Sequence, residues 1–521
     1  MNIKQAKEEI KNTVKAYLLK EEDGSYRIPA VRQRPVLLMG PPGVGKTQIM
    51  EQIARECRIG LVAYTITHHT RQSAVGLPYI VEEEFGGKSC SVTEYTMSEI
   101  IASVYRRMRE TGLQEGILFI DEINCVSETL APTMLQFLQC KTFGNQEVPA
   151  GWIIVAAGNP PEYNKSVREF DMVTLDRVRR MDIEADFGVW KEYAMAQGIN
   201  RALLSYLELR PQNFYRIQAD VDGMQFVTAR GWEDLSNLLD TYDSLGIPVT
   251  EEIIREFIAH EEVAKDVAAY LDLYKKYEDN YGISDILEGR VKAETYQRLL
   301  NASFDERLSV VNLLLSGLDR GFRRTAKIKA VTDGWFRFLK QYRQRLMEEG
   351  AAEDGQPIDA ISLYEEMIKA LEKEWEADKR GGFLTKETER TRKVLLECLN
   401  KAKPETEKVA GLQEDREQIF ELAREGFAQK TKELERAEEE SGKALENGFD
   451  FMEGAFPEGQ ELVVFVTELT MGKESSAFLA ENECERYLKY NRELMVGSRR
   501  AELLSEIQVG EVRAEEHIGG F

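Results

Sequence analysis

Short apolar runs alternate with amphipathic stretches over the first third of the chain. The runs at 35–39, 61–67, 117–120 and 152–157 are apolar or β-branched and do not alternate with polar residues. Such runs are typical of strands in a parallel sheet that is covered on both faces. Between the first two runs, residues 46–58 have helical spacing. Strands that alternate with helices predict an α/β unit of three layers.

Two segments inside this unit have a different pattern. Residues 79–98 alternate apolar and polar side chains around Gly86 and Gly87, which predicts a β-hairpin. Residues 141–150 contain glycine, asparagine and proline and predict a second, tighter hairpin or loop. From 189 to about 269 the pattern becomes helical, as expected for a small all-α domain.

The chain beyond about residue 270 is helical and rich in charge. Apolar residues disappear at 348–357, where Gly and Pro predict a break. Beyond it, 361–378 and 388–402 have the spacing of amphipathic helices. Residues 413–446 carry alternating charges with few apolar side chains, which predicts a solvated helical hairpin or a short coiled coil. Residues 449–469 regain aromatic and β-branched side chains, so we expect this segment to pack against another part of the protein.

These changes of pattern divide the chain into segments. We expect a helical N-terminal segment, an α/β domain, a small all-α domain, a helical extension and a charged helical C-terminal region, at residues 1–30, 31–187, 188–270, 271–347 and 358–521.

Composition narrows the classes of function. The 521 residues include 68 Lys and Arg against 91 Asp and Glu, a net charge of −23. Such a charge repels phosphate backbones, so nucleic acid is not the expected partner. The longest apolar runs are far shorter than the roughly 18 residues that suggest a membrane span. The six cysteines are scattered without a C-x-x-C pair and there are four histidines, which predicts a reduced cytoplasmic protein without a transition metal.

A glycine-rich motif lies between the first strand and the first helix. Residues 40–47 read GPPGVGKT and match G-x4-G-K-[S/T] in full. In such a loop the backbone N–H groups turn inward around the β-phosphate. Lys46 is then expected to span the β- and γ-phosphates, and Thr47 to place its hydroxyl on Mg²⁺. The residues expected to bind the nucleotide here are Gly40, Pro41, Pro42, Gly43, Val44, Gly45, Lys46, Thr47 and Gln48.

The apolar run ILFI is followed directly by Asp121 and Glu122. Asp121 would stand at the end of a strand and complete the Mg²⁺ site. Glu122 could polarise an attacking water as a general base, which favours hydrolysis over transfer to a small molecule. A guanine-specific site usually has N-K-x-D, whereas residues 164–167 read NKSV. We therefore expect ATP with Mg²⁺.

The next apolar strand, WIIVAA, leads to Asn159. If this strand lies beside the Asp121 strand, Asn159 can orient the attacking water or sense the γ-phosphate. The alternative is that Asn159 and the two prolines after it only form a turn.

The ordered set of motifs resembles the MoxR-type AAA+ ATPases of the helix-2-insert group, in the dynein-related class. The resemblance covers about the first half of the chain and implies an α/β P-loop NTPase (AAA+) core with a parallel sheet and β-hairpin inserts. An all-α lid would follow it, and then a long, mostly helical C-terminal region. The segments that carry the resemblance are GPPGVGKT, HTRQSAVGLPY at 69–79, ILFIDEIN, AAGNPPEYN, LDRVRR and TARGWEDLSNLL at 228–239.

The resemblance also implies roles that the residues alone do not give. Asn159 would be the sensor-1 residue, and Arg230 the sensor-2 arginine that reaches from the lid to the γ-phosphate. Arg177 matches the arginine finger that completes a neighbouring subunit's site, and Arg179 and Arg180 stay open as alternatives. The family often has phenylalanine after the finger, which this chain lacks. The hairpins would line a central pore.

As a function, the resemblance implies ATP hydrolysis by a ring, usually a hexamer, that remodels, matures or activates a protein client in a chaperone-like way. Relatives often act with a von Willebrand A-domain protein. This chain has no D-x-S-x-S motif, so that partner would be a separate polypeptide. Two other classes stay open. A DNA-associated motor is disfavoured by the net charge, and a nucleotide-gated scaffold without turnover is disfavoured by the complete set of Lys46, Asp121, Glu122 and Asn159.

Overall fold

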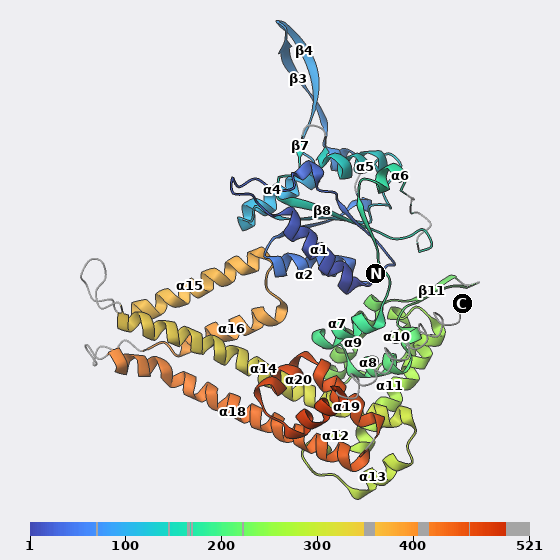
Figure 1. Cartoon of the computed structure of the whole chain (residues 1–521), viewed down its shortest axis with the longest axis vertical. Helices are drawn as coiled ribbons and strands as arrows, with labels where there is room; N and C mark the ends of the chain where they lie inside the picture. Colours follow the sequence, from blue (N-terminus) through green and yellow to red (C-terminus); the bar gives the residue numbers. More distant parts are fainter. Residues whose placement is uncertain are drawn as a thin grey trace, which may run out of the picture.

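The computed structural model of the chain consists of an α/β unit, a lid and a long helical region (Figure 1). It describes residues 1–68, 71–143, 146–163, 167, 170–220, 223–348, 360–404, 416–457 and 459–495. The predicted break at 348–357 and the NKSV segment therefore fall largely outside the described residues.

The α/β unit is built on a five-stranded parallel sheet, as predicted. The strand order is β2-β5-β8-β1-β9, and every neighbouring pair is parallel. The central strands β1, β5 and β8 are buried along almost their whole length, which explains why their sequences show no alternation. The strands are β1 (Val36–Met39), β2 (Gly60–Thr65), β5 (Gly116–Asp121), β8 (Trp152–Gly158) and β9 (Arg179–Asp182).

Helices cover both faces of the sheet. On one face, α1 (Ile3–Tyr17) and α2 (Lys46–Cys57) bury apolar side chains against the strands. On the other face, α4 (Glu99–Thr111) and α5 (Ala131–Cys140) do the same. Two short helices, α3 (Arg71–Val75) and α6 (Met172–Leu175), lie in the connections. The unit therefore has the three layers that the alternation of strands and helices predicted.

Both predicted inserts are antiparallel strand pairs. The first consists of β3 (Pro78–Phe85) and β4 (Lys88–Tyr95) and projects far from the sheet (Figure 1). Its turn residues Gly86 and Gly87 have φ values of 61° and 80°, which a two-residue hairpin turn of the primed type needs and glycine adopts without strain. The second insert pairs β6 (Thr142–Phe143) with β7 (Gln146–Glu147).

The lid follows the sheet and is mostly helical. One strand pair interrupts its helices, β10 (Arg216–Asp220) with β11 (Gly223–Val227), which the prediction of an all-α lid missed. The pair alternates polar and apolar residues over only five positions a side, and this short signal lies between two strong helical patterns. The lid helices are α7 (Phe187–Gln197), α8 (Arg201–Leu209), α9 (Ala229–Leu245), α10 (Glu251–Phe257) and α11 (Glu261–Tyr281).

The predicted domain boundary after residue 270 lies inside α11. The buried residues Val267, Tyr270 and Tyr274 continue on one face of this helix across the boundary. They belong to a hydrophobic core that also contains Phe449 and Phe465, from the segment that we expected to pack against another part of the protein. The lid and a large part of the C-terminal region therefore share one core, because the apolar face of α11 does not end where the charge content of the sequence rises.

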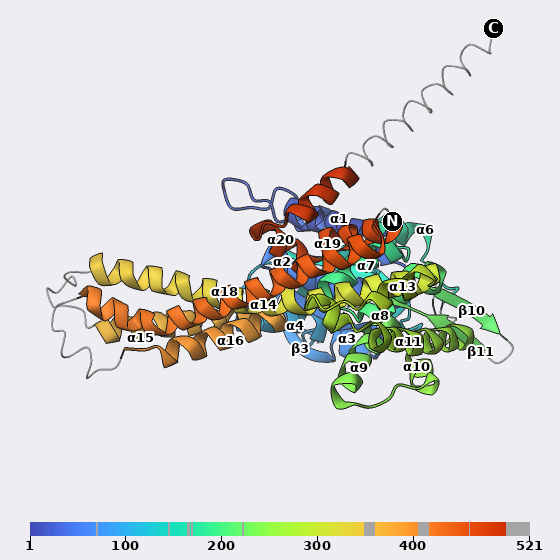
Figure 2. The ribbon, with the colours of Figure 1, turned by 90° about the horizontal axis from the view of Figure 1, so that it is seen from below.

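Two long helices organise the C-terminal region. α14 (Phe304–Glu348) and α18 (Arg416–Ala455) run side by side away from the lid (Figures 1 and 2). Residues 416–446 lie in one continuous helix that pairs with α14. Of the two alternatives predicted for 413–446, a helical hairpin or a short coiled coil, the hairpin is therefore wrong for these residues. Shorter helices of this region are α12 (Ile283–Leu287), α13 (Ala293–Leu300), α15 (Ala360–Gly381), α16 (Lys386–Lys401), α19 (Gln460–Met471) and α20 (Lys473–Glu481). Within the described ranges, each helix is too short or too polar to cross a bilayer.

The helical region contacts the α/β unit again at the end of α15. Asp378 near the end of α15 is almost fully buried and pairs with Arg58 after α2 at 2.7 Å and with Arg392 at 2.9 Å. Arg107 on α4 donates to two backbone carbonyls at the end of α15, at 3.0 and 2.9 Å. The helical region therefore contacts both the lid and the α/β unit.

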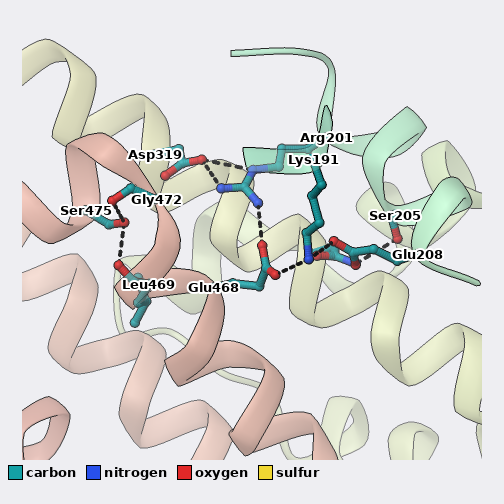
Figure 3. A network of polar contacts seen from close by, with 10 residues as sticks. Lys191, Arg201, Ser205, Glu208, Asp319, Glu468, Leu469, Gly472 and Ser475 are labelled. Atoms are coloured by element: carbon teal, nitrogen blue, oxygen red, sulfur yellow. Dashed lines mark hydrogen bonds and ion pairs between the residues drawn. The ribbon is translucent and has the colours of Figure 1, made fainter. Parts of the chain in front are cut away.

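Buried charges join the lid to the C-terminal helices (Figure 3). Arg201 on α8 donates from Nε to Asp319 on α14 at 2.9 Å and pairs with Glu468 on α19 at 3.3 Å. Lys191 on α7 pairs with the same Glu468 and with Glu208 at 2.9 Å. Burial, together with the charge of Glu468, raises the pKa of Glu208. The network therefore balances two cations against three carboxyl groups inside a shared core.

We expect Arg201→Met to destabilise this junction strongly. The change leaves Asp319 and Glu468 buried beside an apolar side chain, and removing one partner of a buried pair costs about 3–5 kcal/mol. Urea denaturation followed by circular dichroism should show the loss as a lower midpoint. Arg290→Met removes an exposed pairing with Asp285 and serves as the control, because exposed ion pairs contribute little. Equal midpoints for both variants would contradict a stabilising network.

Candidate functional site

A cleft of about 700 Å³ lies between the α/β unit and the lid. The α/β unit contributes the glycine-rich loop, the start of α2 and the ends of β5 and β8, and the lid contributes α7 and the start of α9. Gly40 and Pro41 do not line it directly. The predicted site residues that do line the cleft are Pro42, Gly43, Val44, Gly45, Lys46, Thr47, Gln48, Asp121, Glu122, Asn159 and Arg230.

The order of the strands brings these residues together. β8 lies between β5 and β1, with Ile120 opposite Ala156 and Met39 opposite Gly158. The three strands are parallel, so their carboxyl ends meet at one edge of the sheet, where open α/β sheets bind ligands. The condition set for Asn159, that its strand lies beside the Asp121 strand, is therefore met.

The glycine-rich loop needs glycine at two positions for conformational reasons. Gly43 and Gly45 have φ values of 75° and 92°, in the region that other residues avoid. A Cβ on Gly43 would also lie 2.9 Å from Cβ of Thr228 in the lid. Gly45 is the N-cap of α2, so the free N–H groups at the start of this helix face the cleft. A phosphate fits at such a helix end.

Lys46 is buried at the base of the loop. Its Nζ donates to the carbonyls of Gly40 and Pro41 at 2.7 and 2.9 Å and to Oδ1 of Asn159 at 2.9 Å. Burial lowers the pKa of Lys46 to about 8, and the charge of Asp121 opposes this shift. The ammonium group is therefore held by three acceptors between the loop and the end of β8.

Thr47 and Asp121 form an oxygen pair beside it. Oγ1 of Thr47 donates to Oδ2 of Asp121 at 2.9 Å, and the backbone N–H of Glu122 donates to Oδ1 at 2.9 Å. Hydroxyl and carboxylate oxygens are the ligands that Mg²⁺ prefers, usually with phosphate oxygens and water completing its shell. The pair therefore fits a magnesium ion. The Glu122 side chain lines the cleft next to it.

The lid supplies contacts that the sequence did not reveal. The Tyr215 hydroxyl donates to the carbonyl of Pro42 at 2.9 Å and so ties the lid to the loop. Glu233 on α9 accepts from Gln48 at 3.3 Å and from the Tyr193 hydroxyl at 3.1 Å. Arg230 lies in the first turn of α9, and its charge contributes to the lowered pKa of Lys46. Tyr215 lies outside any motif, so only the folded chain places it at the loop.

The three candidate finger arginines have different environments. Arg179 donates to Oε1 of Glu9 at 2.6 Å and to Oγ1 of Thr13 at 2.7 Å, both on α1. Arg180 pairs with its neighbour Asp182 at 2.8 Å. Arg177 is exposed, donates to Gln139 on α5, and is not among the described residues that line the cleft of its own chain.

Residues 35–178 match the family model of the AAA domain, dynein-related subfamily. The matched segment contains the glycine-rich loop, the β5 and β8 ends and the first hairpin. No curated protein shows significant similarity to the chain. The parallel sheet and the loop have the fold of a P-loop AAA+ core, and the match supports this for residues 35–178.

Proposed function

We propose that this protein is a Mg²⁺-dependent ATPase of the MoxR type that assembles into a ring and uses ATP hydrolysis to remodel a protein client. The observation that carries the proposal is that two hydrogen-bonded pairs of side chains line the same cleft. Thr47 with Asp121 offers oxygen ligands to a cation, and Lys46 with Asn159 offers donors to the phosphates.

The residues divide the chemistry between them. The loop N–H groups and Lys46 would bind the phosphates, and Thr47 and Asp121 would hold Mg²⁺, which neutralises charge on the phosphate oxygens when bound. The Glu122 carboxylate orients a water and takes its proton as general base. Asn159 orients the same water from the neighbouring strand.

The lid is proposed to report the nucleotide state. Arg230 lines the cleft from α9 and would contact the γ-phosphate, and Tyr215 and Glu233 join the lid to the loop and to α2. Because the lid shares its core with the C-terminal helices, rotation of the lid would carry these helices with it.

The proposed oligomer, client and partner rest on the resemblance to MoxR-type ATPases and on the net charge of the chain. AAA+ domains typically assemble into oligomers, and a hexameric ring would place Arg177 of one subunit at the cleft of the next. The net charge of −23 favours a protein client over a nucleic acid. The six cysteines without a C-x-x-C pair favour the cytoplasm. A separate von Willebrand A-domain protein is the proposed partner, with the charged C-terminal helices as its docking region.

Phosphate release by the full chain tests the proposal directly. We expect turnover with Mg·ATP, its loss when EDTA removes the metal, and weaker turnover with Mg·GTP. Light scattering on the same samples should show an oligomer when nucleotide is present. A monomer that binds ATP without releasing phosphate would favour the nucleotide-gated scaffold. Affinity for DNA that falls steeply with salt would favour the DNA-associated motor.

A further inference from the structure

The short loop after β5 is clamped to the end of β8. The backbone N–H of Ile123 donates to the carbonyl of Ala157 at 2.9 Å, and the N–H of Cys125 donates to the carbonyl of Glu122 at 2.8 Å. Glu122 itself has φ of 58°, in the left-handed region. This conformation is unfavourable for a non-glycine residue and persists only where its surroundings enforce it. The loop therefore holds the Glu122 backbone in a strained but defined position.

Asn124 is the buried side chain of this loop. It is 2% exposed, and its Nδ2 donates to the backbone carbonyl of Asn159 at 2.8 Å. Its Oδ1 is buried and has no hydrogen-bond partner among the described residues. A Cβ on Gly158 would lie 2.5 Å from this Oδ1, so the amide fits because position 158 is glycine. Burying an unsatisfied acceptor destabilises the fold, so stability alone does not explain an amide at this position.

The Asn124 amide is linked through Asn159 to Lys46, one of the residues proposed to bind phosphate. Asn159 accepts at its carbonyl from Asn124, and at its side-chain Oδ1 from Lys46 at 2.9 Å. Asn124 also lies two residues after Glu122. One amide therefore connects the loop that carries the proposed base with the residue that contacts the phosphate-binding lysine.

We propose that Asn124 is a positioning residue for ATP hydrolysis. It fixes the peptide of Asn159 against the loop that carries Glu122. The Glu122 and Asn159 side chains, which orient the attacking water, are thereby held at a constant distance from each other. The inference rests on the proposed function and extends it to a residue that does not line the cleft. A misplacement of about 1 Å in a site of this kind can cost about 10²-fold in rate, which a single lost hydrogen bond can cause.

The test is Asn124→Leu in the full chain, which keeps the branched shape of the side chain and removes the donor. We expect kcat to fall by about 10²-fold while KM for ATP and the dissociation constant of a fluorescent ATP analogue change less than about threefold. Asn124→Asp, which has the same shape and no N–H donor, should lower kcat in the same way. Asn213→Leu is the matched control, because Asn213 is a buried lid residue whose Nδ2 donates to the Tyr206 hydroxyl at 2.7 Å. It should keep the parent kcat.

Each outcome has one meaning. Turnover in the parent with an unchanged kcat in both Asn124 variants would overturn the positioning role and leave the ATPase proposal intact. A parallel loss of nucleotide binding, thermal stability and kcat in both variants would make Asn124 a packing residue and overturn the inference. No turnover in the parent would overturn the proposed function and this inference with it.

Discussion

Glu122→Gln is expected to lower the rate of phosphate release by about 10²–10⁴-fold, the usual contribution of a general base. The amide keeps the size of the carboxylate but cannot take a proton from water. ATP binding should survive, because the phosphate contacts proposed for Lys46 and the loop do not need Glu122, and the Thr47–Asp121 pair also stays in place. The variant should therefore bind ATP as the parent does and retain it.

Single-turnover phosphate release and equilibrium binding of a fluorescent ATP analogue measure the two effects separately. Glu128→Gln is the matched control, because it makes the same change at an exposed position six residues further along. It should leave both quantities unchanged. Turnover of Glu122→Gln within a factor of three of the parent would contradict the assignment of Glu122 as the base.

The parts of the fold that the sequence predicted are those with dense local signals. The buried strands β1, β5 and β8 are continuous apolar runs, and the first hairpin has a Gly-Gly turn between alternating residues. The glycine-rich loop is similarly local, since eight consecutive residues define it. The placement of Asp121 and Asn159 on one edge followed once their strands were recognised as parallel neighbours.

The parts that the sequence did not predict depend on contacts between distant segments. The pairing of α14 with α18 joins positions more than 100 residues apart, as between Thr325 and Ser441 at 3.1 Å. Tyr215 reaches the loop only because the lid folds over it. Asn124 was part of the ILFIDEIN motif, yet its contact with the carbonyl of Asn159 requires the register of two strands. None of these contacts leaves a periodic signal along the chain.

The structure also separates Arg177, which matches the finger in sequence, from the alternatives Arg179 and Arg180. The Arg179 guanidinium donates two hydrogen bonds to side chains of α1, and Arg180 pairs with a carboxylate on its own strand. A finger must extend away from its own subunit and reach a neighbour's phosphate. The exposed position of Arg177, and its contact with an uncharged glutamine, suit that task best. We therefore retain Arg177 as the proposed finger.

Arg177→Ala is expected to lower turnover by about 10³-fold, the lower end of the contribution of an arginine finger, with ATP binding preserved. Arg180→Ala should change turnover far less, because Arg180 already neutralises Asp182 on the same strand. Phosphate release by each variant, measured at concentrations where the parent is oligomeric, checks this difference. Equal losses in the two variants would contradict a specific role for Arg177.

Mixing two inactive variants tests whether the arginine acts between subunits. Glu122→Gln chains keep Arg177 but lack the base, and Arg177→Ala chains keep the base but lack the finger. In a mixed ring, a Glu122→Gln subunit supplies its arginine to the intact site of an Arg177→Ala neighbour, so turnover should rise well above the sum of the separate samples. A finger that acts within its own chain cannot be supplied in this way. Strictly additive turnover in mixed oligomers would therefore exclude the ring arrangement proposed for Arg177.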